Sequence, residues 1–139
     1  FILVGHSFGG FTARYLAAKF PKNIVGLVLV DSSHPEQIYR LSALDKVKQK
    51  SLVTRRKNLA PEDFSEFERK WYFLNSSRKA TFAQMGELKY FKESAYQVKH
   101  SGPIKDIPVA VLSRGIEQLP ELNGVSLENE WQDMQKDLD

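Results

Sequence analysis

The chain contains no cysteine, which excludes a disulfide framework and a thiolate metal site. It fits a cytoplasmic protein, which is the location we expect. The three histidines, at positions 6, 34 and 100, lack metal-ligand spacing, so we expect no metal and no other cofactor. No apolar run approaches the ~20 residues of a membrane helix, so we expect no membrane span. Internal repeats and low-complexity tracts are also absent.

No nucleic-acid motif accompanies the charged residues, although their distribution is uneven. Residues 36–102 carry fourteen Lys and Arg against eight Asp and Glu, a net charge of +6. Residues 103–139 carry three against eight, a net charge of −5. Because charges of both signs are interspersed, the pattern is typical of solvated helix faces. We expect no nucleic-acid partner; weak attraction of an anionic ligand is the functional alternative. The pattern indicates no particular oligomeric state.

The first third of the sequence predicts a strand, a helix and a second strand. Residues 1–4 form a short, wholly apolar run, which is typical of a strand buried on both faces of a parallel sheet. Residues 9–20 change to helical spacing with many alanines. Residues 24–30 are apolar and β-branched again and end at Asp31. A strand–helix–strand unit predicts parallel strands with a right-handed connection.

The rest of the chain predicts a helical segment followed by a return to the sheet. Residues 36–102 are polar and basic, with helical patterns at about 37–58, 62–75 and 77–99. We expect the apolar stripe of the second helix to pack in the core; its members are Phe64, Phe67, Trp71 and Leu74. Residues 107–112 predict a third buried strand, and Ser126 is a candidate N-cap for a last helix. Leu127, Trp131, Met134 and Leu138 share one face of that helix.

One motif carries chemistry, the G-x-S-x-G sequence Gly5-His6-Ser7-Phe8-Gly9. Five residues are weak evidence alone, but this motif lies where an apolar strand ends and a helix begins, as a nucleophile elbow requires. Such a turn lifts the Ser7 hydroxyl clear of the sheet. We expect Gly5 and Gly9 to remove Cβ atoms that would collide, and the Phe8 N–H to stabilise an oxyanion. The alternative is a glycine-rich turn with a structural or phosphate-binding role.

FILVGHSFGG resembles the elbow of α/β-hydrolase-fold proteins, IVGLVLVDSSHPEQ resembles the following strand of their esterase-like branch, and IPVAVLSRG more loosely resembles the next strand. The resemblance implies an α/β fold with a mostly parallel sheet, three strands of which are present. It implies hydrolase core at 1–35, a helical cap or lid inserted at 36–102, and core again at 103–139. The cap would lie over Ser7 and shape its pocket.

In this family the triad follows the chain order serine, acid, histidine. Asp31 is the first candidate acid, because it ends the strand after the elbow and can emerge at the same sheet edge as Ser7. Glu117 is the second, because it follows the next strand; the family pattern there is an aspartate three residues after a glycine, and Gln118 stands at that position. An acid elsewhere is the third possibility, and a structural aspartate capping the turn is the other interpretation of Asp31.

No histidine of the sequence suits the role of base. His6 lies inside the elbow and His34 beside the candidate acid, so both are candidate pocket residues, although a turn or hinge role fits His34 better. His100 precedes the third strand, in the wrong chain order. Because the chain opens at Phe1 inside a strand-like run, we expect it to be a fragment, with the first strands and the catalytic histidine outside it, and to be inactive alone.

The resemblance implies a serine hydrolase that cleaves an ester, thioester or related acyl bond of a small molecule through an acyl-enzyme on Ser7. A serine at this position excludes the aspartate-dependent epoxide hydrolases and haloalkane dehalogenases of the fold. Two alternatives stay open: a non-catalytic binding protein that keeps the elbow, and an acyltransferase with the same nucleophile.

Overall fold

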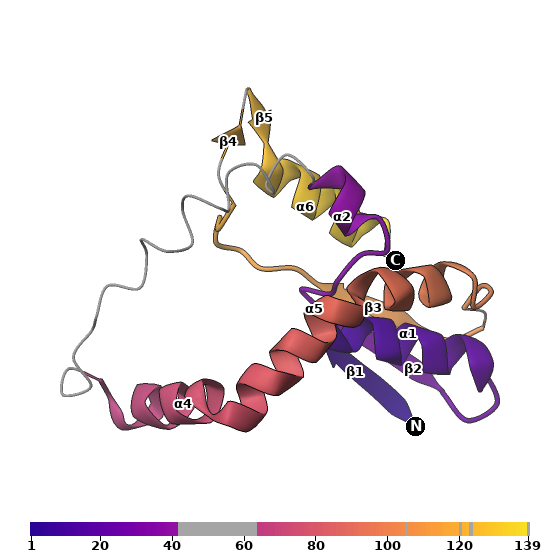
Figure 1. Ribbon diagram of the computed structural model, residues 1–139. Helices are drawn as coiled ribbons and strands as arrows, with labels where there is room; N and C mark the ends of the chain where they lie inside the picture. Colours follow the sequence, from indigo (N-terminus) through magenta and orange to yellow (C-terminus); the bar gives the residue numbers. More distant parts are fainter. Residues whose placement is uncertain (42–63, 105, 120, 123, 139) are drawn as a thin grey trace. The chain divides into compact units, whose positions relative to one another are not determined.

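The computed structural model of the protein describes residues 1–41, 64–104, 106–119, 121–122 and 124–138. The chain divides into two compact units. One combines Phe1–Leu44 with Phe91–Asp139, and the other is Asp45–Tyr90. Figure 1 follows the elements along the chain.

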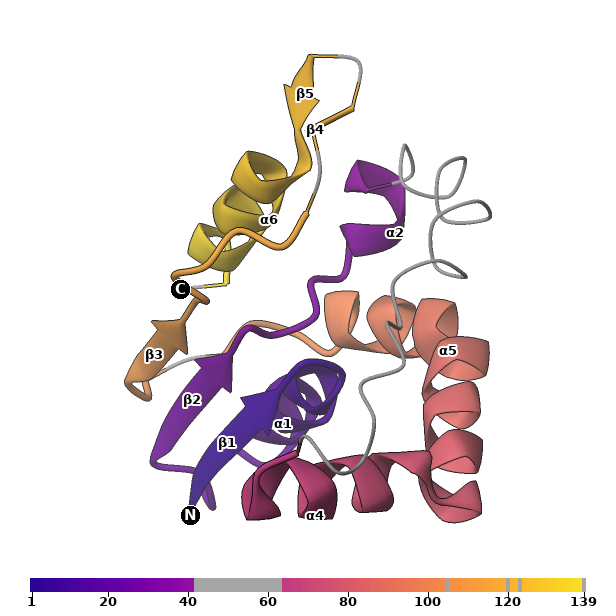
Figure 2. The ribbon, with the colours of Figure 1, turned by 90° about the vertical axis from the view of Figure 1, so that its left-hand side faces the viewer.

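Three parallel strands form the central sheet of the first unit. Strand β1 spans Ile2–His6, β2 spans Gly26–Val30 and β3 spans Val109–Leu112. Their order across the sheet is β1-β2-β3, and the three arrows point the same way in Figure 2. The apolar, β-branched runs therefore form the parallel strands that the sequence predicts, and the predicted α/β class with a parallel sheet of three strands is confirmed.

Helix α1, Gly9–Lys19, connects the first two strands and covers one face of the sheet. Ala13 is 5% exposed and packs with Leu27 and Leu29, which point to the same face of β2. The opposite face of β1 is open, because Ile2 is 65% exposed and Val4 67%. The apolar run predicted a strand buried on both faces. Within the described residues, this expectation is wrong for the face that carries Ile2 and Val4.

Helix α6, Leu127–Lys136, is the last element of the first unit. A short antiparallel pair of strands precedes it, β4 (Glu121–Leu122) and β5 (Val125–Ser126). Ser126 caps the helix, because its Oγ accepts the Asn129 N–H at 3.2 Å. The predicted apolar face is buried, with these members: Leu127, Trp131, Met134 and Leu138. The cap and the helix face are thus confirmed, whereas the sequence did not predict the small β-pair.

The segment between β2 and β3 is helical where it is described. Helix α2 spans Gln37–Arg40, α4 spans Glu66–Ser76 and α5 spans Arg78–Lys99. Most of the first predicted helix, at 37–58, and the predicted start of the second near 62 lie outside the described residues. Helix α4 begins instead at a capping box, in which Ser65 and Glu68 satisfy each other's backbone N–H groups.

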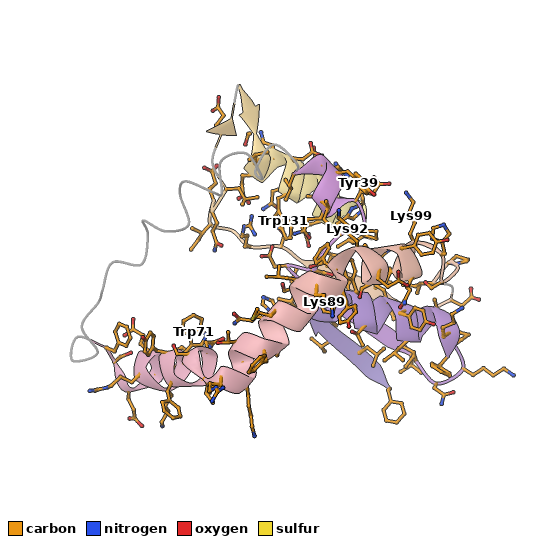
Figure 3. The ribbon with its side chains drawn as sticks, in the orientation of Figure 1. Tyr39, Trp71, Lys89, Lys92, Lys99 and Trp131 are labelled. Carbon is orange, nitrogen blue, oxygen red and sulfur yellow. The ribbon has the colours of Figure 1, made fainter. Side chains whose placement is uncertain are left out.

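Three of the four residues of the predicted stripe are exposed on α4, so their predicted core role is wrong. Phe64, which precedes the helix, is half-buried, and its ring lies 5.6 Å from that of Tyr72. Phe67 is 76% exposed, Trp71 59% and Leu74 67%. Trp71 is labelled on this helix in Figure 3. Among the described residues, no helix combines the length and the apolar character required to cross a bilayer.

Candidate active site

Ser7 lies on a sharp bend between β1 and α1. Its φ angle of +51° is in the left-handed region, which non-glycine residues adopt only where the surroundings enforce it. Three backbone hydrogen bonds hold this conformation. The Ser7 N–H donates to the Val30 carbonyl at 3.2 Å, and the Ser7 carbonyl accepts the N–H groups of Gly10 at 3.0 Å and Ser33 at 2.9 Å. The residue is exposed, at the carboxyl end of the sheet.

Gly5 and Gly10 allow the strand and the helix to approach each other closely at this bend. A Cβ at Gly5 would lie 2.7 Å from the Gly9 carbonyl oxygen, and a Cβ at Gly10 would lie 1.8 Å from Ser32 Oγ. A Cβ at Gly9 would meet no described atom within 4 Å. The expectation for Gly5 therefore agrees with the geometry. For Gly9 it is wrong, because the first turn of α1 presents the next residue, and not Gly9, to Ser32.

Phe8 places a backbone N–H at the start of α1. This N–H has no hydrogen-bond partner within the described part of the chain, as is usual for the first donors of a helix. The Phe8 ring packs edge-on against Phe11 at 5.6 Å between centroids and lies 6.1 Å from Phe91 of α5. A cavity of about 130 Å³ adjoins these rings. The aromatic contacts thus fix the position of Phe8 at the start of α1.

Asp31 follows β2 at the same edge of the sheet as Ser7. It too has a positive φ, +42°, and its N–H donates to the Leu112 carbonyl at 2.7 Å. Its carboxylate accepts the Trp131 indole Nε1–H at 2.7 Å through Oδ1, and it accepts Arg114 Nη1 at 3.0 Å through Oδ2. Figure 3 labels Trp131 on α6. Both interactions leave the side chain 23% exposed.

Glu117 has a different environment. It is exposed, and no hydrogen bond or ion pair of its carboxylate is found among residues 1–41 and 64–138 with the gaps stated above. The two candidate acids therefore differ in how their carboxylates are held. Two donors hold the Asp31 carboxylate, whereas the Glu117 carboxylate lies in solvent.

Glu128 is a buried acid that the sequence interpretation did not single out. Burial raises its pKa, but bonds from Arg114, the Gln118 N–H, Gln132 and the Leu119 N–H outweigh burial and lower the pKa to about 2. Its side chain is 6% exposed. Glu128 is therefore ionised near neutral pH and anchors the Arg114 guanidinium at 3.0 Å.

The histidines lie in three different settings. His6 is exposed on β1. His34 is 8% exposed, and its Nδ1 accepts the Glu36 N–H at 3.1 Å. Burial, together with the charges of Arg14 and Arg40, lowers the pKa of His34. The environment thus favours a neutral ring in a turn that leads into α2. His100 is exposed and places Nδ1 2.8 Å from the Tyr96 carbonyl oxygen.

Sequence reasoning missed Arg114 and Glu128 and treated Trp131 as core only. Asp31 is 83 residues from Arg114 and 100 from Trp131, so no local spacing relates these side chains. A tryptophan on the apolar face of a helix also gives no sign that its N–H meets a carboxylate. Within the described ranges no group of three His, Cys, Asp or Glu side chains is arranged to hold a metal ion.

Comparison with known proteins adds two matches. The model of a family described as "alpha/beta hydrolase fold" matches residues 1–118. The Bacillus subtilis (strain 168) protein "Uncharacterized protein YbdG" is similar to this chain, with 40% identity over 50 residues. That similarity covers 34% of this chain and 15% of the relative, so the chain matches only a small part of it. No solved structure shows a significant match.

Proposed function

Because the chain belongs to the α/β-hydrolase fold family, we propose that it contributes the nucleophile and the acid of a serine hydrolase. The reaction is cleavage of an ester, thioester or related acyl bond of a small molecule. The observation that carries the proposal is the backbone of Ser7, whose φ of +51° presents an exposed residue next to Phe8, whose N–H has no acceptor among the described residues. Backbone strain of this kind persists where the surrounding structure enforces it, and it clusters at active sites.

In the proposed reaction Ser7 Oγ attacks the acyl carbonyl carbon while a histidine base accepts the hydroxyl proton. The carbonyl oxygen becomes an oxyanion, which the Phe8 N–H and the positive end of α1 stabilise. The leaving group takes the proton from the imidazolium, and water then hydrolyses the acyl-enzyme by the same route. Asp31 is the acid that orients the base; Glu117 is the alternative.

None of the three histidines is proposed as the base. A triad histidine donates Nδ1–H to the acid, but Nδ1 of His34 already accepts the Glu36 N–H and Nδ1 of His100 faces a backbone carbonyl oxygen. His6 makes no contact with a carboxylate among the described residues. We therefore propose that the base lies outside this sequence.

The test is covalent labelling of the full-length protein by a fluorophosphonate, which reacts with activated serines. We expect labelling of the wild type and none of Ser7→Ala. Ser113→Ala is the matched control, because Ser113 is also an exposed serine at the carboxyl end of a strand but has no positive φ. Labelling that persists in Ser7→Ala would refute the nucleophile.

Labelling and turnover assays of the same full-length protein distinguish the alternative functions. Absence of labelling and of ester turnover would favour a non-catalytic binding protein. Labelling with transfer of the acyl group to an added alcohol, in preference to water, would favour an acyltransferase.

A further inference from the structure

Two side chains from the last third of the described chain hold the carboxylate of Asp31. The Trp131 indole donates to one oxygen at 2.7 Å and the Arg114 guanidinium to the other at 3.0 Å. Since each oxygen has its own donor, the two bonds restrict rotation of the carboxylate group. The positive φ of Asp31 and the bond from its N–H to Leu112 fix the backbone as well.

A second set of contacts fixes the two donors. Arg114 lies over the Trp131 ring, with 4.8 Å from the guanidinium carbon to the ring centroid, and its Nη2 donates to Glu128 at 3.0 Å. Glu128 in turn accepts the N–H groups of Gln118 and Leu119 at 3.1 and 3.2 Å. The Arg114 side chain is 15% exposed. Arg114 therefore bridges two carboxylates and has little freedom to leave either.

Resting on the proposed function, we propose that Trp131 and Arg114 are positioning residues that hold Asp31 in the orientation a triad acid requires. An ionised carboxylate has about four lone-pair sites. The two donors use one on each oxygen, so sites remain free for the N–H of a histidine base. Rigid supporting contacts of this kind keep a reacting group in its productive geometry.

The competing explanation is that the cluster only ties α6 to the end of the sheet. Under that explanation the loss of one bond lowers the stability of the protein but leaves the chemistry of the folded molecules unchanged. Both explanations predict a lower melting temperature for the variants. Only the positioning role predicts a lower rate constant of reaction for the folded molecules.

The experiment measures fluorophosphonate labelling of the full-length protein as a maximal rate, kinact, and a binding constant, KI. Trp131→Phe keeps an aromatic ring at this position and removes the N–H donor together with part of the buried indole. We expect kinact to fall about tenfold, the order of a hydrogen bond to a charged group, with KI unchanged. Trp71→Phe is the matched control, because Trp71 is 59% exposed on α4, and we expect both constants to stay at wild-type values.

Two further variants keep the inference testable if Trp131→Phe fails to fold. Replacement of Trp131 by 3-benzothienylalanine exchanges the indole N–H for sulfur at nearly constant shape, and the same fall in kinact is expected. Arg114→Gln removes the guanidinium that donates to the second carboxylate oxygen and should also lower kinact.

Wild-type kinact in the folded Trp131 variants would overturn the inference. Wild-type labelling of Asp31→Asn would overturn it too, because Asp31 would then not be the acid, while the role of Ser7 would stand. If the wild-type protein itself is not labelled, the proposed function and this inference are overturned together.

Discussion

Replacement of Gly10 by alanine should destabilise the protein, whereas the same replacement at the neighbouring Gly9 should not. A Cβ at Gly10 would lie 1.8 Å from Ser32 Oγ and 2.8 Å from Ser32 Cβ, and Ser32 is fully buried. Carbon atoms in contact are normally about 3.5–4.0 Å apart. Rotation of the hydroxyl relieves the first contact but not the second, so the backbone of α1 or of the turn after β2 must move.

The expected cost follows from these contacts. Insertion of one methyl group into a packed site typically costs about 1–3 kcal/mol, and we expect about 2 kcal/mol for Gly10→Ala. For Gly9→Ala we expect a change within about 0.5 kcal/mol, because the methyl group enters open space and alanine favours the helix. Gly5→Ala should cost more than Gly10→Ala, because its nearest neighbours, the Gly9 oxygen at 2.7 Å and the Gly10 Cα at 2.8 Å, are backbone atoms.

The assay is urea denaturation of the full-length protein, followed by circular dichroism, to obtain the free energy of unfolding of each variant. The double variant Gly10→Ala/Ser32→Gly removes both clashing atoms and keeps the backbone bonds of residue 32 to Gln135, at 3.1 and 2.9 Å. We expect a favourable coupling of at least about 1 kcal/mol between the two changes. Equal destabilisation by Gly9→Ala and Gly10→Ala, or no coupling in the double variant, would refute the packing argument.

Two further predictions concern stability. The pKa of Glu128 in the folded protein is about 2, below its ordinary value of 4.5, so its contacts stabilise the fold above about pH 4.5 and are lost as the pH falls towards 2. Glu128→Gln should therefore lower the free energy of unfolding at neutral pH, and its difference from the wild type should shrink over that window; a constant difference in acid denaturation curves would contradict this. Ser126→Ala removes the bond from the Asn129 N–H at 3.2 Å and should cost about 1 kcal/mol; an unchanged melting temperature would show that the cap contributes nothing.

The strands, the helix α1 and the position of the serine were predictable because each depends on neighbours in sequence. The signals for β1, α1, β2 and the motif around Ser7 lie within the first thirty residues, and β3 has its own apolar run at 107–112. The apolar face of α6 and its cap at Ser126 were predictable for the same reason, since both repeat over one or two turns.

The stripe on α4 shows where local pattern fails. Its spacing correctly predicts a helix, but burial depends on whether another element lies against that face, and spacing contains no information about a partner. The same holds for β1, whose apolar residues are alike in sequence, although Leu3 is half-buried against the core and Ile2 and Val4, on the other face, are exposed.

By itself the sequence determined the parallel strands and the bend at Ser7, because backbone preference and hydrophobic period are local properties, and it left the triad acid open between candidates. Only the tertiary structure decided that Gly10, and not Gly9, gives the close approach to Ser32. It also decided that Asp31 meets Arg114 and Trp131. Those contacts join residues up to 100 positions apart, and such pairs are set by how the elements pack and not by the residues next to them in the chain.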